Sequence, residues 1–391
     1  MLSAGKFSKE RELKMNNRER IMNILHYKPV DRWPAVHFGY WPELLCEWAD
    51  KGLIPRDLAE NAYDGNAADL ELDRIIGWDF NWNNHERPNI KLWPTFEPQV
   101  LEVFPDGTRR EISELGVVQR VKPGLVSIPS EEDYLLKDRD AFLRHYKDRM
   151  QYTDDRLDLD YFRKFNETRR WDIPIGLKLG SVLGDLRNIT TVVGMSYLMY
   201  DEDEDLLADI VDTYAEMQYK CTEAILATGA TFDFAQYWED ICFKTGPLFA
   251  PDKVRELCAK HYQKRNDLCH KYGIDVIALD CDGVTEALLP MWFETGVNTV
   301  FPIEVGVWGD QFVAARKKFG RGMLGVGGLE KNVFRQDRDA VDAELARVME
   351  IAKLGGFLPC PDHRLMPGSK FELVQYYIEK IQEYQIAFVE E

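Results

Sequence analysis

Two carboxylates stand one residue apart at the end of an apolar run. Residues 274–279 are mostly apolar and lead into Asp280, Cys281, Asp282 and Gly283. A short apolar run that ends in acidic residues and glycine is typical of a buried parallel strand meeting a loop. Because side chains alternate along a strand, Asp280 and Asp282 are expected on one side. Such a pair could bind a metal ion or exchange protons with a substrate, although it could also simply cap a helix or shape a turn.

Chemically capable side chains also follow other expected strands. They are His37, Tyr40, Lys178, Tyr237, Trp238, Glu239, Asp240, Glu304, Lys331, Asp362 and His363. Each has an ordinary explanation as well: a hydrogen-bonded core histidine, an acidic helix start, a neutralising lysine or a packing aromatic ring. What favours function is that all of them follow strands, whereas the strand starts carry little of chemical interest.

The elements that must position these residues repeat along the chain. Apolar runs begin near residues 33, 78, 175, 231, 275, 298, 323 and 356, and helical patterns separate them. Eight β/α repeats predict an α/β fold, a single (β/α)8 TIM-type barrel, whose active site lies at the C-terminal ends of the strands. An open doubly wound sheet is the alternative, but no GxGxxG motif follows a first strand.

Two regions depart from the repeat. Residues 1–15 are expected to form a flexible N-terminal arm, followed by the barrel over residues 16–391, with Asn16 and Glu19 spaced as a capping box. Residues 83–170 are interpreted as an insertion into the barrel. Strands near 100–104 and 108–112 flank Pro105-Asp106-Gly107, a hairpin signal, and a third strand is expected near 116–121. The charged stretch 130–170 indicates surface helices.

The composition limits the kinds of partner and the cell compartment that can be expected for this protein. The formal net charge is −18, which disfavours nucleic acid or an anionic membrane surface as a partner. The seven cysteines form no CxxC pair, as expected for a protein of the reducing cytoplasm. The N-terminus lacks the apolar core of a signal peptide, and no apolar run approaches the ~20 residues that span a membrane.

Several motifs taken together resemble the uroporphyrinogen decarboxylase superfamily. They are Tyr237-Trp238-Glu239-Asp240 with Gly246-Pro247-Leu248, Asp282-Gly283 with Leu289-Pro290, Pro302-Ile303-Glu304, Gly327-Gly328-Leu329-Glu330-Lys331, and Gly355-Gly356-Phe357 with Asp362-His363. The opening, Asn17-Arg18-Glu19-Arg20 to Pro29-Val30-Asp31-Arg32-Trp33-Pro34, is also similar. The resemblance covers most of the chain. It implies a (β/α)8 barrel and, often, a homodimer.

One branch of that superfamily decarboxylates a porphyrinogen with eight carboxylates, which an arginine-bearing loop after the first strand receives. The equivalent loop here, residues 37–43, contains no arginine. Because guanidinium groups are the usual bidentate partners of carboxylates, uroporphyrinogen is expected to be a poor substrate. A decarboxylase-like lyase remains one alternative, and a non-catalytic tetrapyrrole- or corrinoid-binding protein is another.

The other branch contains zinc-dependent, corrinoid-linked methyltransferases. Their His-x-Cys ligands and later Cys ligand fall on Asp280, Asp282 and the vicinity of His363, so the thiolates are replaced by oxygen and nitrogen donors. Such donors suit zinc or another divalent metal and favour an ether or hydroxyl oxygen over a thiol. The resemblance therefore implies a methyltransferase that acts on a small methylated compound such as a methyl ether, with the corrinoid carried by a partner protein.

Roles follow from that interpretation. The metal is expected at Asp280, Asp282, His363 and Glu304, and the catalytic groups are expected to be Glu239, Lys331 and Lys178. His37, Tyr40, Tyr237 and Trp238 are expected to contact the substrate. In the rival interpretation no metal is bound, and Lys178 or Lys331 balances the carboxylate charge in an acid/base site.

Overall fold

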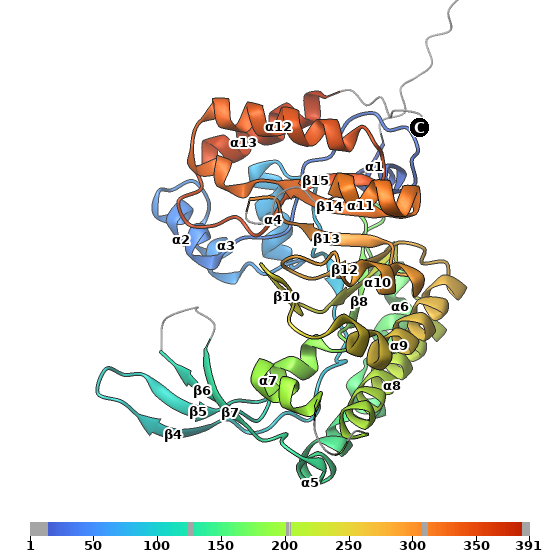
Figure 1. The fold of residues 1–391 in the computed structure, drawn as a ribbon. Coiled ribbons are helices and arrows are strands. Elements are labelled where there is room, and N and C mark those ends of the chain that lie inside the picture. The colour runs from blue at the N-terminus through green and yellow to red at the C-terminus, as the bar shows by residue number, and fades with distance from the viewer. Residues whose placement is uncertain (1–14, 123–128, 201–202, 204, 307–311, 385–391) are drawn as a thin grey trace, which may run out of the picture. The chain divides into compact units, whose positions relative to one another are not determined.

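Strands and helices alternate along the chain in the computed structural model (Figure 1), which describes residues 15–122, 129–200, 203, 205–306 and 312–384. The proposed arm therefore lies, up to residue 14, outside the described residues. The chain divides into two compact units. The first comprises residues up to Trp82, Arg170–Pro174 and the chain from Lys331 onward, and the second comprises Asn83–Arg169 and Ile175–Glu330.

The first unit contains three strands and six helices of the α type among its described residues. They are α1 (Asn17–Leu25), β1 (Val36–His37), α2 (Pro42–Asp50), α3 (Arg56–Asn61), α4 (Ala67–Ile76), β2 (Phe80–Asn81), α12 (Arg338–Ala352), β15 (Phe357–Pro361) and α13 (Phe371–Glu383). The expected capping box opens α1, because the Glu19 amide donates to Asn16 Oδ1 at 2.9 Å and the Asn16 amide to Glu19 Oε2 at 3.0 Å. β1 pairs in parallel with β2, and β15 packs against β1.

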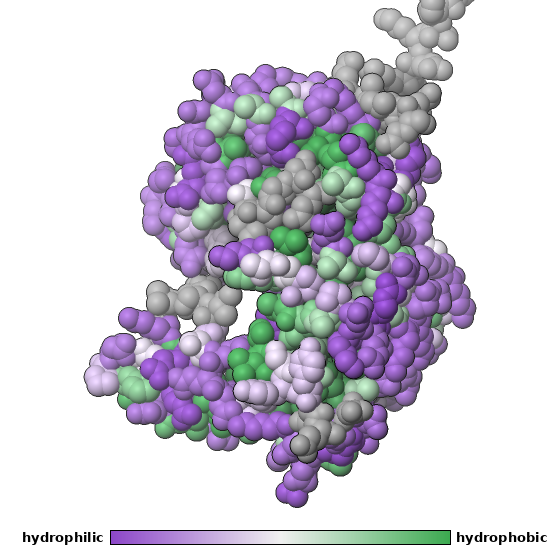
Figure 2. All heavy atoms as spheres, viewed as in Figure 1, coloured by the Kyte–Doolittle hydropathy of each residue, from purple (hydrophilic) through white to green (hydrophobic). Residues whose placement is uncertain are grey.

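The second unit contains the longer sheet and its helices. Its main elements are β3 (His85–Glu86), β8 (Gly176–Gly180), α7 (Gly184–Leu198), α8 (Leu206–Ala227), β9 (Phe234–Trp238), α9 (Pro251–Lys271), β12 (Ile277–Asp280), α10 (Leu289–Glu294), β13 (Thr299–Ile303), α11 (Phe312–Phe319) and β14 (Leu324–Leu329). Its strands lie in the order β14-β13-β12-β9-β8-β3. The pairings between β3, β8, β9, β12, β13 and β14 are all parallel. α8 and α9 lie side by side (Figure 1), and their outer side is hydrophilic (Figure 2).

The predicted α/β class with TIM-type alternation is confirmed. A strand lies close to each of the eight predicted starting points, namely β1, β2, β8, β9, β12, β13, β14 and β15, and at least one helix separates most successive strands. The strands were predictable because parallel strands are buried on both faces and therefore appear as apolar runs. β8, for example, buries Leu177 and Leu179 completely.

The region that was interpreted as an insertion forms a four-stranded antiparallel sheet in the order β4-β5-β6-β7. Its strands are β4 (Gln99–Val103), β5 (Arg109–Ile112), β6 (Val117–Val121) and β7 (Ser130–Tyr134), so the hairpin and the third strand are confirmed. The expectation of helices from residue 130 is wrong at β7, although α5 (Arg139–Ala141) and α6 (Leu159–Thr168) follow. Glu132 explains the strand, because it forms ion pairs with Arg110 of β5 and Arg120 of β6.

A buried ion pair ties residue 169 to the strand that follows α8. Arg169 Nη2 lies 2.5 Å from Asp233 Oδ2, and the two side chains are 1% and 3% exposed. Arg169 Nη1 also donates to the Thr231 carbonyl at 2.6 Å, and the Ile175 amide donates to Asp233 Oδ2 at 2.9 Å. The pair therefore holds the starts of β8 and β9 at a fixed separation.

No helix within the described residues has the length and apolar character needed to cross a membrane.

Replacing Arg169 by leucine should lower the free energy of unfolding by about 3–5 kcal/mol, because Asp233 is left buried without its cation. Urea denaturation followed by circular dichroism measures the change. Arg163→Leu is the matched control, since the Arg163 side chain is 58% exposed in its pair with Asp160. Equal effects of the two substitutions would show that burial does not set the importance of the Arg169 pair.

Candidate active site

Strand alternation gives the second unit's sheet one polar face and one apolar face. Lys178 of β8 and Gln236 of β9 are paired in register, and Asp280 lies two residues beyond Ala278, the partner of Gln236 on β12. These three side chains therefore share one face. Their neighbours Tyr237 and Leu279, also paired in register, are buried on the other face, where the Tyr237 hydroxyl donates to Asn266 of α9 at 2.8 Å.

A chain of polar contacts crosses the polar face. His85 Nε2 lies 3.2 Å from Gln236 Oε1, and Gln236 Nε2 donates to Asp280 Oδ2 at 3.4 Å. Lys178 Nζ lies 3.9 Å from the same Asp280 oxygen. Since Gln236 accepts from His85 through its oxygen, His85 carries its proton on Nε2. Asp280 and Lys178, which were both predicted from the sequence, thus form an ion pair.

Burial changes the pKa values of the two basic residues in this series of contacts, Lys178 and His85. It lowers the pKa of Lys178, although the charge of Asp280 opposes the shift. It also lowers the pKa of His85 well below its usual value, and the neighbouring Lys178 adds to that effect. His85 is therefore neutral near pH 7, and Lys178 gives up its proton more readily than a lysine in water.

A buried carboxyl group at the start of α7 adds a second acid. Asp185 is 8% exposed, and the Tyr214 hydroxyl donates to its Oδ2 at 3.2 Å. Burial raises the pKa of Asp185 to about 6, and the charges of Lys91 and Lys178 limit the increase. A carboxyl group with such a pKa can donate or accept a proton near neutral pH. The sequence analysis missed this residue.

Three more carboxylates follow β9, β12 and β13. They belong to Asp240, Asp282 and Glu304, and the Gly283 amide donates to Glu304 Oε2 at 2.8 Å. Burial raises the pKa of Asp240, as do the charges of Asp282 and Glu304, whereas Arg187 opposes the shift. Arg187 Nη2 lies 3.6 Å from Asp240 Oδ2. Asp282 and Glu304, both predicted metal ligands, are therefore close enough to Asp240 to influence its ionisation.

Asp240 has a φ of 51°, a left-handed conformation that costs energy for a residue with a side chain. Strained residues of this kind cluster at functional sites. Arg187 also lies over the Trp238 ring, 5.7 Å from its centroid. Trp238, Asp240 and Arg187 thus form a connected group at the end of β9.

Glu239 is held in place rather than open to a substrate. It is fully buried, and its carboxylate accepts hydrogen bonds from the amides of Val182, Leu183 and Gly184 at 2.7–3.0 Å. The Ser181 hydroxyl donates to it at 2.9 Å and the Tyr262 hydroxyl at 2.6 Å. The carboxylate therefore stabilises the N-terminus of α7, which favours negative charge. This geometry gives Glu239 a positioning role in place of the predicted contact with reacting atoms.

Tyr237 and Trp238 lie on opposite faces of the sheet, because side chains alternate along a strand. Tyr237 packs edge-on against Tyr262 of α9, with ring centroids 5.1 Å apart, and is fully buried. It therefore lies on the helix side of the sheet, whereas Trp238 shares the face of Gln236. Of these two predicted substrate contacts, only Trp238 is on the polar face.

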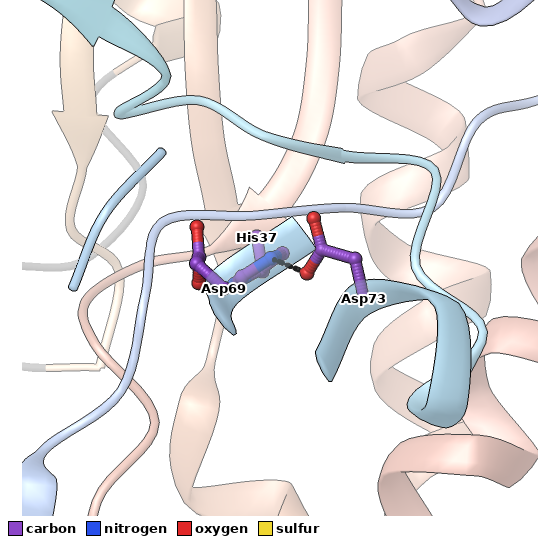
Figure 3. A group of neighbouring side chains, drawn as sticks. All are labelled: His37, Asp69 and Asp73. Carbon is purple, nitrogen blue, oxygen red and sulfur yellow. Dashed lines mark hydrogen bonds and ion pairs between the residues drawn. The ribbon is translucent and has the colours of Figure 1, made fainter. Parts of the chain in front are cut away.

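His37 lies in a buried group of the first unit (Figure 3). Its Nε2 is 2.7 Å from Asp73 Oδ1, its Nδ1 accepts from the Gly39 amide at 3.0 Å, and Asp69 lies on its other side. One potential ligand atom from each of His37, Asp69 and Asp73 lies within 4.8 Å of the others. No other such group of three occurs among the residues that the structure describes. The predicted substrate contact Tyr40 packs on His37, with ring centroids 5.0 Å apart.

Lys331 and His363 also belong to the first unit. The Lys331 amide donates to Asp362 Oδ1 at 3.1 Å, and its Nζ lies 3.9 Å from the same oxygen. The His363 ring stacks on Trp41 at 6.5 Å and meets Phe38 edge-on at 5.3 Å. Asp362 therefore pairs with the predicted Lys331, and His363 sits between aromatic rings.

The predicted residues are thus distributed over both units. Lys178, Tyr237, Trp238, Glu239, Asp280, Asp282 and Glu304 belong to the second, and His37, Tyr40, Lys331 and His363 belong to the first. Asp185, Gln236 and Arg187 were missed, although Asp185 and Arg187 follow a predicted strand. Asp69 and Asp73 were missed because they lie within a helix. Their spacing of four residues on α4 is the signal that they share one side of it.

A depression of about 570 Å³ on α8 and α9 contains none of the predicted residues. Its charged lining includes the interhelical pairs of Lys260 with Asp212, 2.7 Å apart, and of Lys264 with Glu216, 2.5 Å apart. These residues neutralise one another, so the chemistry at the strand ends identifies the candidate site better than the size of this depression.

Known structures resemble the fold. A methyltransferase from Methanosarcina mazei matches 94% of this chain and 98% of its own at 15% sequence identity, with a TM-score of 0.57. A B12-independent methionine synthase from a Shewanella species matches 90% of this chain and 98% of its own at 10% identity, with a TM-score of 0.47. A putative vitamin-B12-independent methionine synthase from Listeria monocytogenes matches 59% of this chain and 70% of its own at 14% identity, with a TM-score of 0.38. No protein-family model and no curated protein matches the sequence.

Glu239→Gln should lower the free energy of unfolding by at least about 2–4 kcal/mol, because an amide NH2 group then faces buried amide donors that need an acceptor. Tyr262→Phe, which removes one donor and leaves the carboxylate, should cost less. Glu256→Gln, an exposed change on α9, should have no measurable effect. Urea denaturation of the three variants gives the order. A stable Glu239→Gln variant would contradict the anchoring role.

The raised pKa of Asp185 makes stability depend on pH. The ordinary value is 3.8 and the folded value is about 6, so the folded state binds a proton in this range that the unfolded chain does not. Its stabilising contribution is present below pH 3.8 and is lost as pH rises through 6. Asp185→Asn should therefore gain about 2–3 kcal/mol relative to the wild type between pH 4 and pH 8. Denaturation at both pH values tests this, with exposed Asp267→Asn as control; an equal pH dependence in wild type and Asp185→Asn would refute it.

Proposed function

We propose that this protein is a methyltransferase. The observation that carries the proposal is the fold likeness to the Methanosarcina mazei methyltransferase, which extends over 94% of this chain. The polar face of Lys178, Gln236 and Asp280 supports it, because it supplies acid/base groups at the strand ends, where barrels of this type carry out their chemistry. The decarboxylase alternative is not favoured by any feature of the described residues.

The proposed reaction transfers the methyl group of a small methyl ether to a reduced corrinoid that a partner protein carries. The carbon–oxygen bond of the ether would break, the reduced corrinoid would supply the electron pair that accepts the methyl group, and the leaving oxygen would take up a proton. Oxygen-rich side chains at the predicted site suit an ether better than a thiol. A homodimer in the cytoplasm remains part of the same proposal.

Lys178 is the proposed proton donor. Its Nζ would give a proton to the leaving oxygen, and Asp280, 3.9 Å away, would orient the ammonium group. Burial lowers the pKa of Lys178, which brings proton donation closer to neutral pH. Gln236 donates to the same Asp280 oxygen at 3.4 Å, so it helps to hold the carboxylate beside Lys178 before the substrate binds.

A divalent metal fits the donor chemistry of the predicted ligands. Asp282 and Glu304 would hold it in the second unit, and Asp280 is a further proposed ligand there, whereas the predicted ligand His363 belongs to the first unit. Such a metal, when bound, would polarise the ether oxygen and stabilise the leaving group as a Lewis acid. Three carboxylates and one arginine, Arg187, give this region a negative charge that a divalent cation would offset.

The remaining side chains would bind the substrate. Trp238 lies on the polar face and offers an aromatic surface to a methoxylated ring. Arg187, above the Trp238 ring, is placed to attract an anionic substituent such as a carboxylate. Glu239 would keep α7, which carries Arg187, in position. A methoxylated aromatic acid is therefore the substrate class to examine first.

Wild-type protein mixed with a methoxylated benzoate, a divalent metal salt and cob(I)alamin should produce methylcob(III)alamin and the corresponding phenol. Absorbance follows the corrinoid and chromatography follows the phenol. Asp280→Asn should slow the reaction by about 100-fold or more, since it uncouples the proton donor from its partner. Asp275→Asn, at the other end of the same strand and exposed, should leave the rate unchanged.

Absence of both products from wild type across a panel of methoxylated aromatics would contradict the ether substrate. Equal rates in Asp280→Asn and Asp275→Asn would instead leave methyl transfer in place and remove the assigned role of the polar face.

A further inference from the structure

The buried group around His37 has chemistry of its own (Figure 3). Asp69 and Asp73 lie four residues apart on α4 and are 2% and 6% exposed, and His37 of β1 between them is fully buried. Two carboxylates held together away from water are costly unless a cation or hydrogen bonds compensate them. The question is what compensates Asp69 and Asp73.

His37 does not provide the cation. Its Nδ1 accepts the Gly39 amide hydrogen at 3.0 Å, so this nitrogen carries no proton, and Nε2–H donates to Asp73 Oδ1 at 2.7 Å. Gly39 has a φ of 97°, a conformation that keeps its amide in this direction at little cost only for glycine. The charges of Asp73 and Asp69 raise the pKa of His37 against the effect of burial, but a proton on Nδ1 would point at the Gly39 amide hydrogen. His37 is therefore neutral in this arrangement, and it orients Asp73 as the histidine of a carboxylate–histidine pair does.

Basic side chains do not provide it either. Arg364 forms its ion pair with Asp64, and Arg170 forms its own with Asp172, although the charge of Asp73 also helps to raise the pKa of Arg170. Among the residues that the structure describes, no lysine or arginine forms an ion pair with Asp69 or Asp73. Asp69 Oδ2 accepts from the Gly65 amide and from Asn81 Nδ2, both at 2.9 Å. These neutral donors stabilise one oxygen of Asp69 and leave the charge of the pair uncompensated.

A third oxygen faces the same group. The Tyr40 hydroxyl is buried, with the residue 6% exposed, and has no hydrogen-bond partner. Its ring lies 5.0 Å from the His37 ring, and the charges of Asp73 and Asp69 add to burial in raising its pKa. An unpartnered buried hydroxyl beside two carboxylates is expected where an unobserved ligand completes its contacts.

We propose that Asp69, Asp73 and Tyr40 bind a hard divalent cation such as Mg²⁺, Mn²⁺ or Ca²⁺. The donors are all oxygen atoms, which these ions prefer, and both nitrogens of His37 are occupied by hydrogen bonds. His37 is the positioning residue, because it fixes Asp73 through one oxygen and leaves the other to the ion. The ion neutralises the two carboxylates and links β1 to α4. This site includes neither Lys178 nor Asp280, the pair proposed to transfer the proton.

Titration of chelator-treated, full-length protein with Mn²⁺, followed by the loss of the free-ion electron paramagnetic resonance signal, tests the proposal. Wild type should bind Mn²⁺ at a site that Mg²⁺ or Ca²⁺ competes for. Asp69→Asn should weaken this binding about 100-fold or more, and Tyr40→Phe about 10-fold, as expected from loss of a charged and a neutral ligand. Glu71→Gln, whose side chain is 41% exposed on the same helix, should bind as wild type does.

Mn²⁺ binding at this site can be distinguished from Mn²⁺ binding at the metal site proposed for catalysis. If Asp282→Asn abolishes Mn²⁺ binding and Asp69→Asn does not, the ion belongs at the strand ends and the present proposal is overturned. Wild type that binds none of the three ions also overturns it, and a proton on Asp69 then neutralises the pair. Thermal unfolding in an Asp282→Asn background controls for folding and for the catalytic metal: Mn²⁺ should raise the midpoint when Asp69 is present, with or without Glu71→Gln, but not when Asp69→Asn is added.

Discussion

The buried carboxylate of Glu239 is the interaction on which the second unit depends. It follows β9 directly and gathers the amides of residues 182–184, the Ser181 hydroxyl and the Tyr262 hydroxyl around one charge. One side chain thus joins the end of β8, the start of α7 and the middle of α9. The Gly184 position shows how tight this junction is, since a Cβ atom there would lie 1.9 Å from the Glu239 carbonyl oxygen. Arg187 and Asp185, one turn into α7, are placed by it.

The structure compensates its buried carboxylates in different ways, and each way has different consequences. Asp233 has an arginine as its partner, and Glu239 accepts hydrogen bonds from five donors. Asp185 accepts a hydrogen bond from the Tyr214 hydroxyl, and burial raises its pKa to about 6. Burial and the charge of Asp73 likewise raise the pKa of Asp69 to about 6. Groups of the first kind hold elements together, whereas the second kind are able to exchange a proton or bind a cation.

Regular features of the chain could be predicted from the sequence, because they depend on local patterns. The eight strand positions follow from apolar runs, and the start of α1 follows from the spacing of Asn16 and Glu19. β7 was missed because its residues are charged, and its stability comes from Glu132 meeting arginines on two other strands. The position of Tyr237 on the helix side could have been predicted from strand alternation, because adjacent residues such as Tyr237 and Trp238 cannot both face the substrate from one strand.

The contacts between the site residues could not be predicted from the sequence. Asp280 and Lys178 were predicted individually, but their contact depends on the register of β8, β9 and β12. The anchoring of Glu239 depends on amides more than 50 residues earlier, and the group around His37 depends on β1 meeting α4, which no local pattern reveals. A carboxylate in a sequence therefore indicates only that its charge must be compensated if the fold buries it. Its partner determines whether that carboxylate positions a helix, holds a proton donor or binds an ion.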